Sequence, residues 1–170
     1  MSSISLLRSR TAAAHEAVDA AFGGFDLLDR EAYTRFLAAH AKALPIAEAR
    51  AAAVWPDLRP RAPLLAEDLV QLGHEGPVVV TPRAANDDPR AWGALYVVEG
   101  SRLGGGMLAK QVGGGLPTAY LAATHAPGEW RDIRSAIDAA GEGKDEHWAE
   151  ELVAGALETF DLYAAAARAA

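Results

Sequence analysis

The chain has 170 residues, of which 51% are hydrophobic, and a formal net charge of −7. This length and apolar fraction suit one domain built around one core. The absence of cysteine excludes disulfides, thiolate–metal sites and cysteine nucleophiles. The negative charge argues against general nucleic-acid binding, which depends on lysine and arginine neutralising phosphates.

We expect a single cytoplasmic domain over residues 1–170. No apolar run reaches the ~18 residues that a membrane span needs. The N-terminus, MSSISLLRSRTAAAHE, lacks the basic start and long apolar stretch of a secretion signal. Alanine and leucine dominate the apolar residues, which favours packed helices.

The first half of the chain predicts three helices. The first runs from about Ser5 to Phe22, and Asp29 caps a second that reaches Trp55, with a bend or restart at Pro45. Pro63 opens the third, which ends at Gly73. Residues that recur every three or four positions form the expected inner faces of the first two helices: Leu7, Thr11, Ala14, His15, Val18 and Phe22, then Tyr33, Phe36, Leu37, His40 and Leu44.

The second half of the chain predicts four further helices. The three valines at 78–80 favour a short strand, but one strand makes no sheet. The expected helices open at Pro89 and end before Gly113, lie near Tyr120, run from Trp130 to Ala139, and run from about Asp145 to Arg168. The pattern predicts an all-α, bundle-like domain.

A glycine-rich stretch, YVVEGSRLGGGMLAKQ at 96–111, lies inside one predicted helix. Each helix-interior glycine costs about 1 kcal/mol relative to alanine, so Gly100, Gly104, Gly105 and Gly106 cost roughly 3–4 kcal/mol together. The stretch is neither a phosphate loop nor a dinucleotide fingerprint. Two explanations remain: helix–helix packing through small residues, or a flat cofactor lying against a kinked helix.

The histidines give no metal motif by spacing alone. None has the Glu-x-x-His spacing of a di-iron bundle or the spacing of a zinc protease. His15 lies on the expected buried stripe, where a lone histidine is more often a core residue than a ligand. We expect His40 to be structural, and we expect His74, His125 and His147 to lie at or near the surface.

Two segments resemble the haem oxygenase family. LRSRTAAAHEAVDAAF matches the family's first helix at Leu7, Arg8, Thr11 and His15, and ALYVVEGSRLGGGMLAKQ is similar to the distal helix of bacterial members, including those associated with phytochromes. The matches lie about 80 residues apart in the correct order. ALETFDLYAAAARA resembles the family's last helix more weakly.

The resemblance implies a haem-oxygenase-like helical bundle that holds haem between the first helix and a kinked distal helix. It implies that His15 is the iron ligand, that Arg8 lies near a haem propionate, and that Thr11 and Gly100 belong to the haem site. Gly104 and Gly105 would form the distal wall. The implied reaction cleaves haem to biliverdin, carbon monoxide and ferrous iron, using O₂ and an external donor such as ferredoxin or a flavin reductase. A biliverdin-accepting phytochrome is an implied partner.

One position departs from the family pattern. Counted back from Gly104, the place where many haem oxygenases carry an aspartate is Ser101. We expect Ser101 and ordered water to supply protons instead. Glu99 is about 200° around the helix from Ser101, at ~100° per residue, so we do not expect it to face the haem.

Two other functions remain open. One is a non-catalytic protein of the same fold that binds haem or biliverdin. The other is a relative of the thiamin-degrading enzymes, which is disfavoured because those enzymes use a cysteine.

Overall fold

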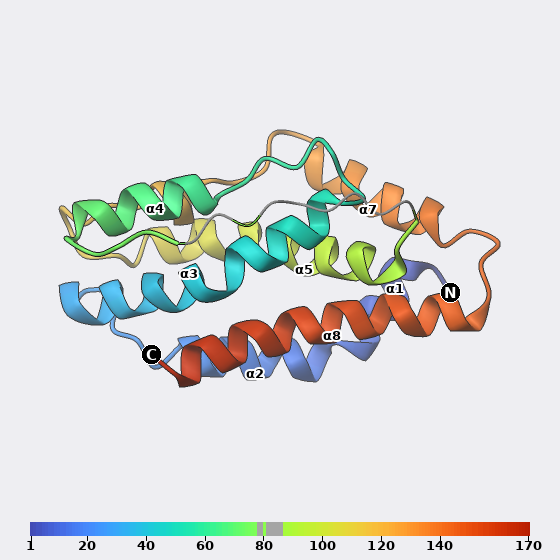
Figure 1. Ribbon diagram of the computed structural model, residues 1–170, viewed down its shortest axis with the longest axis horizontal. Coiled ribbons are helices and arrows are strands. Elements are labelled where there is room, and N and C mark those ends of the chain that lie inside the picture. Colours follow the sequence, from blue (N-terminus) through green and yellow to red (C-terminus); the bar gives the residue numbers. More distant parts are fainter. Residues whose placement is uncertain (78–79, 81–86) are drawn as a thin grey trace.

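The computed structural model describes residues 1–77, 80 and 87–170, and within them every regular element is an α-helix. The helices, shown in Figure 1, are α1 (Ser3–Arg10), α2 (Ala12–Phe22), α3 (Arg30–Ala52), α4 (Ala62–Gln71), α5 (Pro89–Ala109), α6 (Ala119–Ala122), α7 (Glu129–Ala140) and α8 (Glu146–Arg168).

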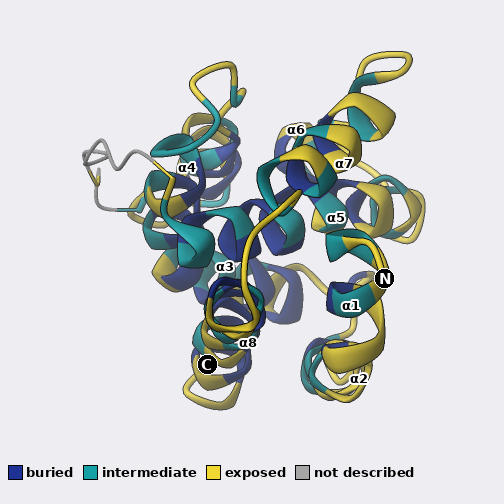
Figure 2. Ribbon diagram, turned by 90° about the vertical axis from the view of Figure 1, so that its right-hand side faces the viewer, coloured by how far each residue is buried: buried dark blue, intermediate teal, exposed yellow. Residues whose placement is uncertain are grey.

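Three long helices, α3, α5 and α8, pack against one another and run roughly along the long axis of the molecule (Figure 1). α2 packs on α8, α4 on α3, and α1 and α7 on each other. Buried residues face the space between these helices, whereas α2 is largely exposed (Figure 2). The core is therefore centred on α3, α5 and α8, and α2 covers only one side of it.

The predicted helix starts are confirmed, because the signals that set them are local. The carboxylate of Asp29 accepts a hydrogen bond from the Ala32 amide at 2.7 Å, and Asp145 accepts one from the Trp148 amide at 2.9 Å. Pro89 occupies the first position of α5. Gly73 follows α4 with a φ of 79°, a conformation that favours glycine.

The predicted helix from Ser5 to Phe22 is in fact two helices. The chain leaves helical geometry at Thr11, where φ is −107° and ψ is 1°, and α2 begins at the next residue. The Thr11 hydroxyl donates to the Leu7 carbonyl oxygen at 2.8 Å. This side-chain bond competes with the regular helical bonds, as threonine hydroxyls commonly do.

The other predicted helix boundaries differ less from those of the structure. α3 runs through Pro45 without ending, and α5 continues as α-helix through its glycines to Ala109. Residues 78 and 79 of the possible strand lie outside the described residues. Among the helices that the structure describes, none is both long enough and apolar enough to span a membrane.

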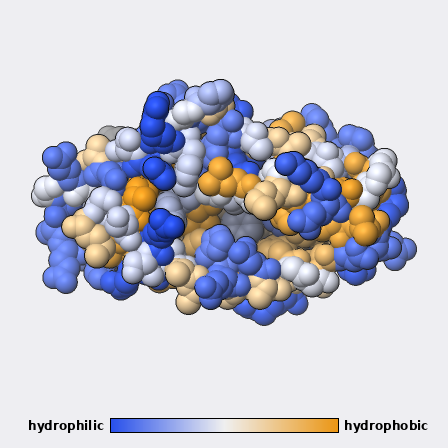
Figure 3. Space-filling model, turned by 180° about the vertical axis from the view of Figure 1, so that it is seen from behind, coloured by the Kyte–Doolittle hydropathy of each residue, from blue (hydrophilic) through white to orange (hydrophobic). Residues whose placement is uncertain are grey.

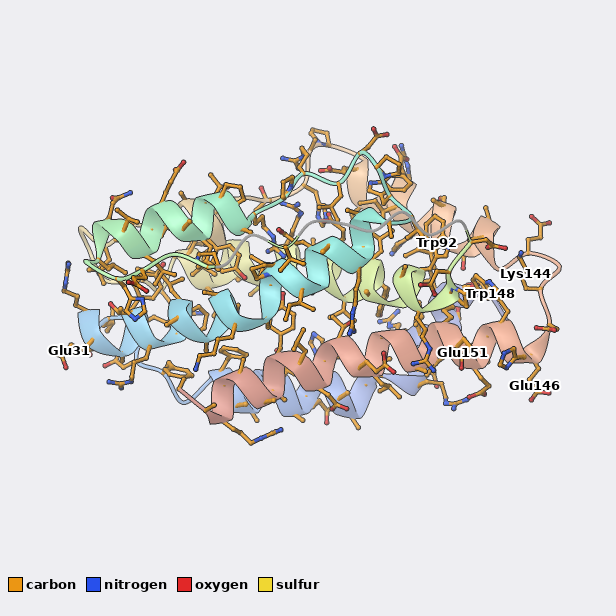
Figure 4. All side chains as sticks on the ribbon, viewed as in Figure 1. Glu31, Trp92, Lys144, Glu146, Trp148 and Glu151 are labelled. Carbon is orange, nitrogen blue, oxygen red and sulfur yellow. The ribbon has the colours of Figure 1, made fainter. Side chains whose placement is uncertain are left out.

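α5 and α8 cross at two glycines that leave no space for a side chain. A Cβ atom on Gly93 would overlap the backbone of Leu152 and Ala156, and one on Gly155 would overlap the backbone of Arg90. The Arg90 guanidinium also binds the carboxylate of Glu151, which Figure 4 labels on α8. The two helices therefore approach until their backbones touch.

Gly93→Ala is expected to destabilise the protein by about 1–3 kcal/mol or more, because the clashing atoms are backbone and cannot rotate away. Gly104→Ala, in the same helix, is the matched control: nothing lies within 4 Å of its added Cβ. It should raise stability by about 1 kcal/mol through helix propensity. Urea unfolding of both variants measures the difference, and equal stabilities would rule out close packing at Gly93.

Candidate functional site

A cavity of about 310 Å³ lies between α2 and α5 and extends inward to α3, α6 and α8. Its volume is at the lower end of the range for small-molecule sites. Viewed from behind, the molecule is hollowed near its centre, with apolar side chains around the hollow (Figure 3). The residues that line the cavity are mostly apolar or aromatic, with polar groups at a few points.

His15 reaches this cavity from α2. Its side chain is 62% exposed, so the predicted burial of this residue is wrong: the stripe that should bury it faces an open cavity. Its Nδ1 atom is 3.2 Å from the Asp19 carboxylate, one helical turn along. Its ring meets the ring of Phe160 edge-on, with 5.8 Å between centroids. Nε2 has no hydrogen-bond partner among the residues that the structure describes, so it can bind a ligand.

The glycines of α5 do not form one bare patch. Gly100, Gly104 and Gly105 line the cavity, and a Cβ on Gly104 would meet nothing within 4 Å. A Cβ on Gly105 would be 3.1 Å from the Leu121 carbonyl oxygen, and one on Gly106 would be 2.8 Å from the Thr124 methyl group. Close packing therefore accounts for Gly105 and Gly106, whereas the flat-cofactor explanation stays a prediction for Gly100 and Gly104.

Arg61 supplies a buried positive charge at the inner end of the cavity. It is 2% exposed, and its Nη2 atom donates to the Ser101 hydroxyl at 2.7 Å and to the Val98 carbonyl oxygen at 2.9 Å. Ser101 donates in turn to Val98 at 2.6 Å. The Arg61 guanidinium lies 5.3 Å from the centre of the Tyr120 ring. Its Nε atom is buried and has no hydrogen-bond partner among the described residues.

His40 also faces the cavity, inside a cage of aromatic rings. Its Nδ1 atom lies 2.9 Å from the Phe36 carbonyl oxygen, so Nδ1 carries the proton and Nε2 is an acceptor. The centroid of its ring lies 4.3 Å from that of Phe22 and 4.4 Å from that of Phe36. Burial lowers the pKa of His40 to about 4, which keeps the ring neutral at physiological pH.

Two buried tyrosines complete the inner end of the cavity. Burial raises the pKa of Tyr120 to about 12 and raises that of Tyr163 as well, so both hydroxyls stay protonated. The Tyr163 hydroxyl has no hydrogen-bond partner in the part of the chain that the structure describes. The inner end therefore offers hydrogen-bond donors that a ligand or water could use.

Two buried carboxylates hold this inner end in place. Glu48 on α3 accepts hydrogen bonds from the backbone amides of Arg61 and Ala62, at 2.6 and 3.1 Å, at the start of α4. Asp68 on α4 accepts from the amides of Ala119 and Tyr120, at 3.2 and 2.9 Å, at the start of α6. Burial raises the pKa of both carboxyls.

Arg8 and Thr11, which the sequence places in the same site, lie outside the cavity lining. Thr11 is buried with its hydroxyl turned back to Leu7, so its contribution is to the helix break before α2. Arg8 is exposed on α1, and together with Arg134 of α7 it lowers the pKa of Tyr96, although burial raises that pKa more. Tyr96 lines the cavity, so two arginines lie near one end of it.

The sequence analysis missed several cavity residues: Arg61, Tyr96, Tyr120, Trp130, Phe160 and Tyr163. Tyr96, Phe160 and Tyr163 belong to segments that resemble the family, but nothing local marks them as lining a site. Arg61 lies among prolines in an irregular turn and carries no signal at all. These residues come from the start of α4 and from α5, α6, α7 and α8, so only the packing of those helices brings them together.

Stability should fall by about 1–2 kcal/mol between pH 6.5 and pH 4.5 because of His40. The unfolded chain binds a proton near the ordinary histidine pKa, whereas folded His40 resists protonation until about pH 4. Above pH 6.5 the effect disappears. Urea unfolding of wild type and His40→Gln at both pH values isolates this difference, and His147→Gln, an exposed histidine, is the control. If wild type and His40→Gln differed in unfolding free energy by the same amount at both pH values, the ring of His40 would not be buried and neutral.

Comparisons with known proteins relate this chain to haem oxygenases. No family model matches the chain. A curated protein named "Heme oxygenase" from Xanthomonas campestris pv. campestris (strain 8004) is 46% identical over 54 residues. That match covers 32% of this chain and 32% of that protein, about a third of each.

A solved structure, the NO- and CO-bound heme oxygenase from Neisseria meningitidis, is similar over nearly the whole chain. The TM-score is 0.78 at 26% sequence identity, covering 99% of this chain and 92% of that one. Both findings support the haem oxygenase family. The predicted all-α class is confirmed, and this chain has the haem oxygenase fold.

Proposed function

We propose that this protein is a haem oxygenase, which cleaves haem oxidatively to biliverdin, carbon monoxide and ferrous iron. The observation that carries the proposal is that His15 of α2 and the glycines of α5 line one cavity. His15 is the first of these and offers an imidazole nitrogen to the iron. The glycines are the second and offer a helix surface without side chains. An iron porphyrin can take the first as its axial ligand and lie flat against the second.

The residues of the cavity fit haem in three respects. The walls are mostly apolar and aromatic, which suits a porphyrin face. Gly104 leaves open space where any other residue would place a Cβ. The buried Arg61 Nε and Tyr163 hydroxyl, unpaired among the described residues, leave hydrogen-bonding capacity for bound ligand or water.

His15 would hold the iron through Nε2, and Asp19 would orient the ring. A carboxylate that accepts from Nδ1 fixes the tautomer and makes the other nitrogen a better ligand. The 3.2 Å contact between His15 and Asp19 suits this role. Haem, when bound, would supply the redox chemistry of the reaction.

Ser101 would hold and pass a proton on the α5 side of the cavity, where Gly104 and Gly105 form the wall. Its hydroxyl accepts from Arg61 and donates to the Val98 carbonyl oxygen, and it would turn its O–H from Val98 toward bound water to pass the proton. The Arg61 guanidinium keeps its charge and cannot itself give up a proton at neutral pH. Arg61 is thus a positioning group, and ordered water beside Ser101 would carry the proton to the substrate.

Arg8 would bind a propionate at the other end of the cavity. Guanidinium groups bind carboxylates well, and Arg8 and Arg134 both lie close enough to Tyr96 to affect its pKa. Neither arginine forms an ion pair within the residues that the structure describes. We also propose an external electron donor, such as ferredoxin or a flavin reductase, a cytoplasmic location, and a phytochrome as acceptor of biliverdin.

A protein that binds haem or biliverdin without turnover is the second candidate. One observation favours it: within the described chain, the α5 residues that line the cavity include no carboxylate, and Ser101 stands where many haem oxygenases have aspartate. Binding and turnover therefore need separate tests.

Haem should bind between α2 and α5. In a titration followed by absorption, the wild type should develop an intense Soret band. His15→Ala should change its position, and Gly104→Leu should weaken binding by about tenfold or more because the side chain fills the cavity. Gly114→Leu is the control, since that glycine also has nothing within 4 Å but lies outside the cavity lining. Equal spectra and affinities in all four proteins would place haem elsewhere.

Turnover should follow when the haem complex receives reduced ferredoxin or ascorbate in air. The Soret band should decay and biliverdin should appear. Ser101→Ala should slow this reaction about 3- to 10-fold, because water retains part of the proton pathway. If the wild type binds haem but forms no biliverdin with a competent reductant, the protein is a binding protein and not an oxygenase.

A further inference from the structure

Glu99 belongs to the glycine-rich motif but has no place in the proposed chemistry. It is 1% exposed and is absent from the cavity lining. One carboxylate oxygen, Oε2, accepts from Arg102 Nε at 2.9 Å and from His125 Nε2 at 3.1 Å. Glu99 therefore links α5 to the turn between α6 and α7.

Arg102 ties the same turn to the rest of the fold. Its guanidinium donates to the carbonyl oxygens of Arg59 and Ala123, the latter at 3.3 Å. Arg59 donates to the Thr124 carbonyl oxygen at 3.1 Å and forms an ion pair with Glu129 at 2.6 Å. Two arginines thus hold the backbone just before His125, and the Ala126 amide after it donates to the Glu129 carboxylate.

The side chain of His125 is buried, which corrects its predicted exposure at a turn. Its side chain is 7% exposed, and burial lowers its pKa. Because Nε2 faces a carboxylate oxygen, Nε2 must donate the hydrogen bond. The ring then stacks on Trp130, with centroids 5.5 Å apart and planes inclined by 19°. One face of the Trp130 indole is therefore covered by a ring that Glu99 holds.

Trp130 forms the side of the cavity next to α7. It lines the cavity together with Tyr96, and their ring centroids are 6.2 Å apart. Its Cη2 atom would be 3.8 Å from a Cβ on Gly100, which is van der Waals contact. The indole thus lies against the bare face of α5 and limits the space for a planar ligand on that side.

The buried network is not arranged for stability alone. Glu99 Oε1 and His125 Nδ1 are both buried and lack a hydrogen-bond partner within the described parts of the chain. Unpaired buried polar atoms cost free energy, and they often mark places where structure serves function. Through His125 the network meets Trp130, which lines the cavity.

We propose that Glu99 is a positioning residue that acts through His125 on Trp130, and that Trp130 sets how far toward α7 a planar ligand lies. The second half rests on the proposed function, because the ligand in question is haem. The in-plane orientation of the porphyrin decides which of its bridge carbons faces Ser101. Glu99 thereby influences the site of cleavage without touching the substrate.

The first half is tested without haem, by near-ultraviolet circular dichroism. The contribution of Trp130 is the difference between wild type and Trp130→Phe. Glu99→Gln and His125→Ala should each remove most of the Trp130 contribution to the spectrum. The double variant should lose no more of that contribution than either single variant. Glu151→Gln, which breaks the Arg90–Glu151 pair between α5 and α8, is the control and should leave the Trp130 contribution intact.

The second half is tested on the ferric, cyanide-bound haem complex by proton NMR of the haem methyl groups. Glu99→Gln and Trp130→Phe should shift the methyl pattern in the same direction, whereas Glu151→Gln should not. An unchanged Trp130 signal in folded Glu99→Gln overturns the proposal, and so does an unchanged methyl pattern. If Glu99→Gln fails to fold, His125→Ala decides both tests in the same way. Failure of haem to bind wild type would overturn the proposed function and the second half, while the dichroism would still decide the link from Glu99 to Trp130.

Discussion

The close crossing of α5 and α8 is the constraint on which the other packing depends. Gly93 and Gly155 allow the two backbones to touch, and any other residue at either position would separate the helices. α3 packs against both helices, so this crossing also sets the position of α3. The three helices form a rigid core from which α2 stands away on one side, and the cavity lies in that space.

α5 uses its small residues for different purposes on different faces. Near its start, Gly93 makes the helix crossing, and farther along Gly104 opens space for a ligand. Gly105 lies against the carbonyl of Leu121 in α6. The reverse face carries the buried pair of Glu99 and Arg102. One helix therefore contributes to the core, the cavity wall and the α6–α7 turn. Its glycines cost helix stability, and in return they permit the close contacts and the open space that these parts need.

The sequence predicted what local chemistry controls and missed what depends on distant contacts. The cap at Asp29 and the start at Pro89 follow from neighbouring residues, and the pattern around His15 carried the family resemblance. Periodicity could not distinguish a stripe that faces a core from one that faces a cavity, so the exposure of His15 was not foreseen. Arg61 had no signal, because its partners lie 37 and 40 residues away on α5.

The buried carboxylates at the inner end of the cavity also make the stability of one helix depend on another. α4 lacks a side-chain cap of its own and takes one from Glu48 of α3, and α6 takes its cap from Asp68 of α4. A helix as short as α6 has no stability in isolation. Each helix in this series thus depends on the one before it, and the amide protons of α6 should be the first of the three to exchange with solvent. The innermost wall of the cavity is then the part of this series that opens first.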